Sequence, residues 1–299
     1  MKFENTITSN WKGAFHGLRH PLESYKRSDS EYGITQCYGD ETVDMEDKWV
    51  KKLDPDLYEQ YHSSEWLENT EKDYISKCEE IGDWLWKNGV IQGDDNTDCF
   101  EYVFLGPNDI DLAQRMIKAG TPNDKFLRQI FISVDITAPL YWWKECDQYR
   151  VSCTTNSTST MHKLASTPIT LDCFEMDDYQ NVKMYDREPY NLDQYTDDMW
   201  DSIVCYCETL RQLYLETKDV KYWKELIRIL PESWLQTRTW TANYSVLRNI
   251  IYWRKGHKLK YEWDSFIKWC QSLPYSQELL FYANGYDNEY KLHDLLSSK

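Results

Sequence analysis

The sequence lacks every short motif that marks the common nucleotide-dependent, acyl-transfer and zinc enzymes. No GxGxxG, GxxxxGK[ST], GxSxG or HExxH pattern occurs along its 299 residues. Those patterns provide phosphate-binding loops, nucleophilic serines and zinc ligands. A Rossmann, P-loop, hydrolase or zinc-protease function therefore has no motif to support it.

Paired cysteines are missing too. The nine cysteines are odd in number and scattered, without a CxxC pair, so we interpret them as reduced thiols of a cytoplasmic protein. His16 and His20 have the spacing of metal ligands on a helix, but Gly17 and Pro21 make a helix there doubtful. We therefore expect no metal site.

Long apolar runs and a surplus of basic residues are also absent. No stretch of eighteen apolar residues and no signal-peptide core occurs, so we expect a soluble protein that does not contact a membrane. The chain is acidic, with 34 Lys and Arg against 50 Asp and Glu and a net charge of −16. This charge argues against a duplex nucleic-acid surface. It leaves room for a local basic pocket that binds one nucleotide.

The composition does provide a core, because 41% of the residues are hydrophobic and 15% are aromatic. Residues 1–92 are predicted to form a polar arm and a helical extension, with helical spacing between residues 65 and 88. Residues 93–299 are predicted to form the main domain. Its expected strands are 99–105 and 130–137, and its expected helices are 107–119, 140–149, 193–218, 220–230, 261–273 and 277–282, with a short helix after Pro122 and another at the C-terminus.

Residues 230–258 carry the most informative pattern. A β-branched and aromatic run leads into a helix that Asn243 is suited to cap. The helix is expected to bury one apolar face, made of Val246, Leu247, Ile250, Ile251 and Trp253. Asn249 and Arg254 do not fit that face, so they either satisfy the fold or face a ligand.

The hydroxyl-rich run at residues 154–160 reads as a loop rather than a strand. One interpretation is a low-complexity segment without a ligand. The other is an anion site, because Ser and Thr hydroxyls can donate to phosphate oxygens.

The order of these residues resembles the flavin-dependent thymidylate synthases over about residues 100–275. Leu230-Pro231, Trp240-Thr241-Ala242-Asn243, Asn249, Arg254 and Glu262 keep the spacing of one family segment. Upstream, Ala138-Pro139, Gln148-Tyr149-Arg150 and the run from Asn156 to His162 correspond to the family's signature. That signature is only partly present.

The departures remove positive charge. Gln148 and Tyr149 stand where the family has an arginine and a histidine, and Met161 replaces a late arginine. Ser157 replaces the signature glutamate. Each lost charge-assisted hydrogen bond commonly costs about 1.5–3 kcal/mol, so ordinary FAD or dUMP binding would be weakened.

The resemblance implies an α+β fold with a central antiparallel sheet packed by helices, preceded by an N-terminal extension. It implies a homotetramer that binds FAD and dUMP and, if catalysis is retained, uses methylenetetrahydrofolate and NADPH as a methyltransferase. Arg254 would be the catalytic residue. The residues implied for the nucleotide are Arg150, Asn156, Ser157, Ser159, His162 and Arg254, and those implied for the cofactor are Tyr149, Asn243, Asn249 and Lys258.

Each key residue also has a structural interpretation: Arg254 as half of a buried ion pair, Asn243 as a helix cap and Ser159 as a loop hydroxyl.

Three alternative functions are compatible with the sequence. The chain is a divergent flavin-dependent enzyme that methylates a pyrimidine nucleotide reductively, or a non-catalytic protein of the same fold that senses or sequesters a nucleotide, or a structural protein whose N-terminal arm binds a partner.

Overall fold

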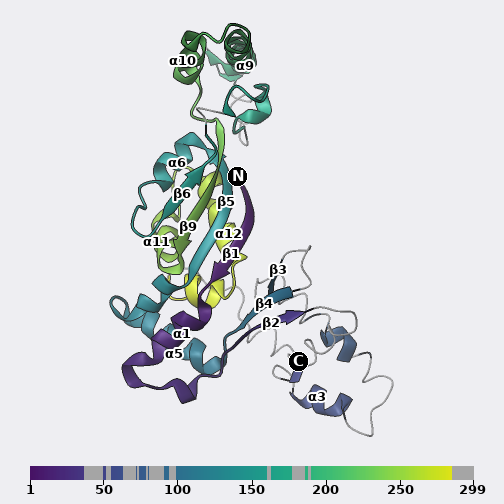
Figure 1. Cartoon of the computed structure of the whole chain (residues 1–299), viewed down its shortest axis with the longest axis vertical. Coiled ribbons are helices and arrows are strands. Elements are labelled where there is room, and N and C mark those ends of the chain that lie inside the picture. The colour runs from purple at the N-terminus through teal and green to yellow at the C-terminus, as the bar shows by residue number, and fades with distance from the viewer. Residues whose placement is uncertain are drawn as a thin grey trace. The chain divides into compact units, whose positions relative to one another are not determined.

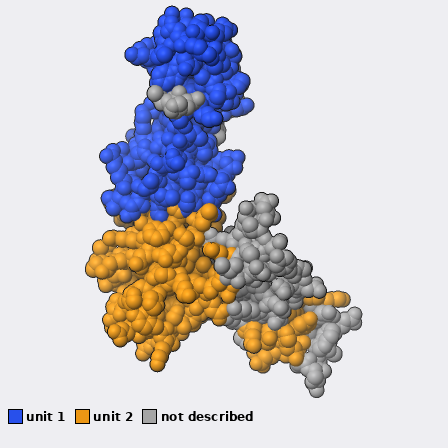
Figure 2. Space-filling model, viewed as in Figure 1, with its two compact units in different colours: residues 1–6, 133–242, 256–265 blue, residues 7–132, 243–255, 266–299 orange. Residues whose placement is uncertain are grey.

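The computed structural model describes residues 1–36, 50–51, 55–62, 72, 74–78, 80, 91–93, 99–159, 163–176, 186–187 and 190–284. The chain divides into two units, coloured blue and orange in Figure 2. Unit 1 comprises residues 1–6, 133–242 and 256–265, and unit 2 comprises residues 7–132, 243–255 and 266–299. Most of the helix predicted at 65–88, and the predicted C-terminal helix, lie outside the described residues.

The main sheet has four strands in the order β1 (Lys2–Ser9), β5 (Phe131–Pro139), β9 (Leu235–Asn243) and β6 (Thr154–Ser157) (Figure 1). β6 pairs antiparallel with β9. Helices combine with a sheet that contains antiparallel strands, so the expected α+β class is confirmed. β1 joins this sheet at its edge, so the first residues of the chain pair with another surface, as expected of an arm without a core of its own.

β5 behaves as its alternating sequence predicts. Ile132, Val134, Ile136 and Ala138 are buried, while the residues between them are partly exposed. Period-two burial of this kind gives each inward side chain about 1.5–3 kcal/mol of hydrophobic stabilisation. The strand ends at Pro139, where α6 (Leu140–Cys146) begins.

Tryptophans fill the core of unit 1. Trp142 and Trp143 on α6, Trp240 on β9 and Trp263 on α12 (Lys260–Gln271) are all fully buried. The rings of Trp142 and Trp263 have centroids 5.1 Å apart. Large rings in contact bury much apolar area for little conformational entropy, which fixes α6 against the start of α12 in this unit.

The prediction of a loop at residues 154–160 is wrong for its first half. Thr154 to Ser157 form β6, in register with Thr241 to Arg238 of β9. All four side chains are exposed. The strand exists because β9 offers an open row of backbone donors and acceptors, and threonine tolerates extended backbone well. Hydrophobic periodicity cannot detect such a strand, since it has no apolar face.

The predicted helix after Asn243 is confirmed as α11 (Tyr244–Arg254). Asn243 caps it, because its Oδ1 accepts a hydrogen bond from the Val246 amide at 3.0 Å. Leu247, Ile250 and Ile251 are buried as expected, but Trp253 is 66% exposed and Asn249 is exposed. The helix therefore buries a narrower face than predicted, and Asn249 is not surrounded by apolar residues.

Unit 2 packs α1 (Trp11–Arg19), α5 (Pro107–Ala119), α11 and the short η3 (Asn123–Gln129) around buried aromatic rings. The ring centroid of Trp11 lies 5.1 Å from that of Tyr244 and 5.8 Å from that of Tyr275.

A second sheet has the order β2 (Glu31–Gln36), β4 (Cys99–Phe104), β3 (Ile91–Gly93). β3 includes the domain boundary expected between residues 92 and 93, and that division stays a prediction.

The helices expected at residues 193–218 and 220–230 are confirmed near their predicted limits. α9 (Leu192–Thr217) and α10 (Val220–Ile229) pack on one another around Cys207, Leu210 and Leu226. The short elements are η1 (His20–Leu22), η2 (Tyr25–Arg27), α3 (Pro55–Tyr61), η4 (Leu171–Cys173), β7 (Asp186–Arg187), β8 (Tyr190–Asn191) and the π-helix η5 (Ser276–Phe281).

Candidate functional site

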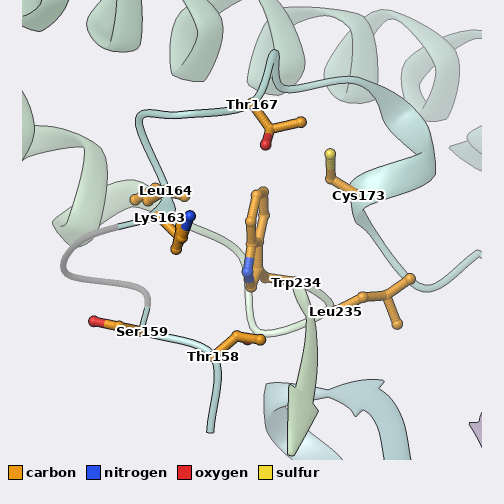
Figure 3. Close-up of a pocket in the computed structure, with 8 residues that line it drawn as sticks. All are labelled: Thr158, Ser159, Lys163, Leu164, Thr167, Cys173, Trp234 and Leu235. Carbon is orange, nitrogen blue, oxygen red and sulfur yellow. The ribbon is translucent and has the colours of Figure 1, made fainter.

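A cavity of about 230 Å³ lies in unit 1 beyond the end of β6. Figure 3 shows the Trp234 ring in the middle of the lining residues, with Thr167 and Cys173 on one side and Thr158 and Ser159 on the other. The full lining is Thr158, Ser159, Lys163, Leu164, Thr167, Cys173, Trp234 and Leu235.

The polar wall of the cavity is fixed to the sheet. The Thr158 amide donates to the Thr237 carbonyl of β9 at 2.9 Å, and the Gln236 side chain donates to the Thr158 carbonyl at 3.0 Å. The Lys163 amide donates to the Ser159 carbonyl at 2.8 Å. This backbone bond places a lysine and a serine, four residues apart in sequence, on the same side of the cavity.

The position of Trp234 is fixed by contacts with neighbouring residues. Its ring meets Phe174 edge to face, with centroids 5.5 Å apart and planes at 80°. Its carbonyl accepts from the Leu140 amide at 3.1 Å. Trp234 also packs against the small apolar cluster that includes Leu164 and Phe174. A ring positioned this way can act as a stacking wall without first being ordered by a ligand.

The far wall is anchored to α9 by a charged pair. Two nitrogens of Arg211 donate to the Glu208 carboxylate: Nε lies 2.7 Å from Oε2 and Nη2 lies 2.6 Å from Oε1. Glu208 also accepts from the Ile169 amide at 2.8 Å, and Arg211 donates to the Ala165 carbonyl at 3.0 Å. The Arg211 hydrogen bonds lower the pKa of Glu208 to about 2. The segment that carries Thr167 is thereby fastened at both ends.

The chemistry of the lining favours an anion with a flat ring. Three hydroxyls and one ammonium group line the cavity, and none of its lining residues is acidic. Hydroxyl and ammonium donors bind phosphate oxygens, and the indole offers a face for a base. The volume is below the roughly 300–1,000 Å³ of drug-sized sites, so the cavity suits a small ligand or one end of a larger one.

Among the predicted nucleotide residues that the structure describes, only Ser159 lines this cavity. Asn156 and Ser157 lie exposed on β6, opposite Thr239 and Arg238. Arg150 is exposed, and its Nε donates to the Asp147 carbonyl at 3.3 Å. His162 lies outside the described residues.

The predicted cofactor residues are distributed over both units. Tyr149 is half-buried after α6 and Lys258 is exposed, both in unit 1. In unit 2, Asn243 is 2% exposed and uses its side-chain oxygen as the cap of α11, while Asn249 is exposed. The predicted catalytic Arg254 is the half-buried last residue of α11.

The structure does not gather the predicted cofactor residues around the described cavity, since none of the four lines it. The Asn243 oxygen already serves the helix, and the Arg150 guanidinium binds a neighbouring carbonyl. We therefore assign no chemical step to FAD.

Several lining residues were missed by the motif comparison. Thr167, Cys173 and Trp234 lie in segments without a family signature, although Trp234 comes three residues after the Leu230-Pro231 pair. Lys163 follows the signature run directly and is a cationic substitute close to the missing arginine position. Its charge and its place beside the changed signature already mark it, in the sequence alone, as a possible replacement for that arginine.

Arg238 is a second basic residue that the motif comparison did not identify. It donates to both oxygens of Asp147, at 3.0 and 3.1 Å, and to the Gln236 side chain at 2.9 Å. Its guanidinium also lies 4.4 Å from the centroid of the Trp143 ring. Because its Nε and Nη1 donors are already used within unit 1, Arg238 stabilises the fold.

Among the described residues, no three His, Cys, Asp or Glu side chains gather as a metal-binding group. A helix long and apolar enough to span a membrane is likewise missing from the described part of the chain.

The architecture is therefore a mixed one of helices and an antiparallel sheet, with a cavity at the sheet's end. It is similar to two solved structures of the flavin-dependent thymidylate synthase ThyX from Helicobacter pylori with FAD and dUMP. One has 18% identity over 60% of this chain and 84% of that chain, with a TM-score of 0.42. The other has 17% identity over 69% and 91%, with a TM-score of 0.41.

A third similar structure is the UMP/dUMP methylase PolB from Streptomyces cacaoi, bound with 5-Br UMP. It has 12% identity over 59% of this chain and 84% of that chain, with a TM-score of 0.41. No family model and no curated protein sequence matches the chain.

Proposed function

We propose that this protein binds a pyrimidine mononucleotide in the cavity beside Trp234. The observation that carries the proposal is the joint placement of Lys163, Ser159 and the Trp234 ring around one cavity. The phosphate would contact the Lys163 ammonium and the neighbouring hydroxyls, and the base would pack on the indole. The choice of a pyrimidine rests on the resemblance of residues 230–254 to the thymidylate synthase segment.

Calorimetric titration with UMP and dUMP tests this proposal. Lys163→Gln should weaken binding by about one to two decades, since it removes a charge-assisted hydrogen bond of about 1.5–3 kcal/mol. Trp234→Leu should weaken binding of the nucleotide and of uridine alike, because both need the stacking wall. Lys144→Gln is the matched control, since Lys144 is an exposed lysine paired with Glu232 outside the cavity.

Two results would refute the proposal. One is the absence of binding heat at millimolar UMP and dUMP. The other is unchanged affinity in the Lys163→Gln protein, which would place the phosphate elsewhere.

Reductive methylation of the bound nucleotide is the second candidate. The order of Trp240, Asn243, Asn249 and Arg254, which resembles a segment of the flavin-dependent thymidylate synthases, favours it. In that case Arg254 would contact and activate the pyrimidine, FAD would bind, and the chain would assemble as a homotetramer. A flavin absorption band in the purified protein, with a tetrameric mass by sedimentation, would support this function. Colourless protein that takes up no added FAD would refute reductive methylation. The proposal of nucleotide binding would be unaffected.

A further inference from the structure

Two histidines lie one helical turn apart at the end of α1. The sequence made a helix doubtful here, yet α1 runs without a break from Trp11 to Arg19 and contains His16 and Gly17. His20 follows directly as the first residue of η1. The two imidazole rings have centroids 4.9 Å apart and planes at 74°. The argument against a metal site at this pair therefore no longer holds.

We propose that His16 and His20 form a binding site for a divalent transition metal of the Ni²⁺, Cu²⁺ or Zn²⁺ class. Metal–nitrogen bonds of about 2.0–2.1 Å place two nitrogens on one tetrahedral ion roughly 3.3 Å apart. Rings whose centroids are 4.9 Å apart can bring one nitrogen each to that separation. Neutral imidazole is a preferred ligand for this class of ions.

Tyr25 orients both rings. Its hydroxyl oxygen lies 2.5 Å from His20 Nδ1. When His20 Nδ1–H donates to this oxygen, Nε2 keeps its lone pair for a metal. A hydrogen bond from the second ring nitrogen is the usual way in which a metal-bound histidine is oriented. The Tyr25 ring also stacks on His16, with centroids 4.7 Å apart and planes at 21°. One tyrosine thus restricts the rotation of both candidate ligands.

The site is open rather than closed. His16 and His20 are both exposed, so water can complete the coordination of an ion held by two protein nitrogens. Lys12 lies one turn before His16 on the same helix face, and its charge opposes a bound cation. These features predict micromolar binding of one ion, weaker than that of closed sites with four protein ligands.

Calorimetric titration of the full chain with Ni²⁺ tests the proposal. Ni²⁺ is the probe because imidazole suits it, whereas the softer cysteine thiolates favour other metals. His16→Gln and His20→Gln should each lower the affinity at least tenfold. His62→Gln is the matched control, since His62 is an exposed histidine stacked on a tyrosine ring at 4.1 Å and should bind as the wild type does.

Two further variants separate metal binding from a structural role. Tyr25→Phe keeps the stacking ring but removes the oxygen, so it should weaken Ni²⁺ about tenfold or more. Lys12→Gln leaves the ligands intact and should strengthen binding about twofold or more. Wild-type affinity in the double variant His16→Gln, His20→Gln would overturn the proposal, as would the absence of wild-type binding at millimolar Ni²⁺.

Discussion

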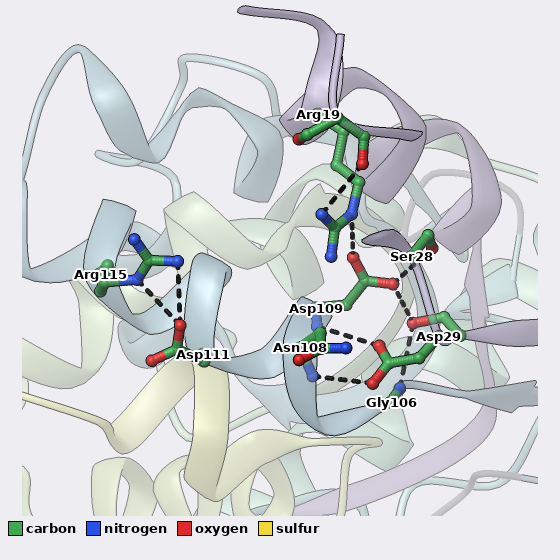
Figure 4. A network of polar contacts seen from close by, with 10 residues as sticks. Arg19, Ser28, Asp29, Gly106, Asn108, Asp109, Asp111 and Arg115 are labelled. Atoms are coloured by element: carbon green, nitrogen blue, oxygen red, sulfur yellow. Dashed lines mark hydrogen bonds and ion pairs between the residues drawn. The ribbon is translucent and has the colours of Figure 1, made fainter. Parts of the chain in front are cut away.

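Arg19 and Asp109 form a buried ion pair, with Arg19 Nε 2.5 Å from Asp109 Oδ1 and the side chains 4% and 0% exposed. The second Asp109 oxygen accepts from the Ser28 and Ser30 hydroxyls at 2.6 and 2.5 Å. Figure 4 shows this network beside Asp29, whose oxygens accept from the Asn108 and Asp109 amides at the start of α5. The contacts fasten residues 19–30 to a helix about eighty positions later.

Replacing Asp109 with asparagine should lower the free energy of unfolding by about 3–5 kcal/mol, because it leaves the Arg19 charge buried without its partner. The matched control is Asp111→Asn on the same helix. Asp111 pairs with Arg115 at 2.9 Å, but those side chains are 66% and 62% exposed. Exposed pairs contribute about 0–1 kcal/mol, so urea unfolding should separate the two variants clearly. Equal losses would contradict a buried role for Asp109.

The sequence predicted the elements whose residues repeat with a clear period. β5 and α11 were predicted near their observed limits, because their apolar residues alternate or recur every three to four positions. β6 was missed because its strand form depends on the open edge of β9, more than seventy residues later. The exposure of Trp253 was missed for a related reason. Periodicity identifies an apolar stripe but not how much of it another element covers.

Asn243 and Asn249 were both predicted to contact the cofactor, and their structural positions now predict different stabilities. Asn243→Ala removes the cap of α11 and should cost about 0.5–2 kcal/mol of unfolding free energy. Asn249→Ala should change stability by less than about 0.5 kcal/mol, because Asn249 is exposed. Thermal or urea unfolding measures both. A larger loss for Asn249 would show that its side chain has a structural partner.

Tyr275 links the end of β4 to the C-terminal region of unit 2 through its hydroxyl. The oxygen accepts from the Leu105 amide at 2.8 Å and donates to the Val103 carbonyl at 3.0 Å, with the residue 4% exposed. Tyr275→Phe leaves these two backbone groups buried without a partner and should cost about 1–3 kcal/mol. Tyr252→Phe, at a tyrosine that is 57% exposed, should be nearly neutral in the same urea experiment.

The candidate site was harder to predict than the fold. Ser159 was identified from the hydroxyl-rich run, but the cavity also needs Thr167, Cys173 and Trp234. Their positions depend on the hydrogen bonds of Glu208 and Arg211 and on the ring contact with Phe174. Such long-range contacts leave no fixed spacing in a single sequence, so the motif comparison found one wall of the cavity and missed the others.

The Glu208–Arg211 pair should make stability depend on pH in the acid range. The pKa of Glu208 falls from an ordinary 4.5 to about 2 in the folded chain, chiefly through the Arg211 hydrogen bonds. A carboxyl whose pKa is lowered by folding stabilises the protein fully above its unfolded pKa. The stabilisation that the Glu208 carboxylate provides is then lost as the pH falls from about 4.5 to about 2.

Comparing wild type with Glu208→Gln isolates this effect. The difference in unfolding free energy should be on the order of 1.5–3 kcal/mol above pH 5, because the hydrogen bonds involve charged groups. It should shrink steadily as urea unfolding is repeated between pH 4.5 and 2. In the Arg211→Met background, Glu208→Gln should have little further effect, since the partner that lowers the pKa is gone. A difference that stays constant down to pH 2.5 would show that Arg211 does not hold Glu208 in its charged form.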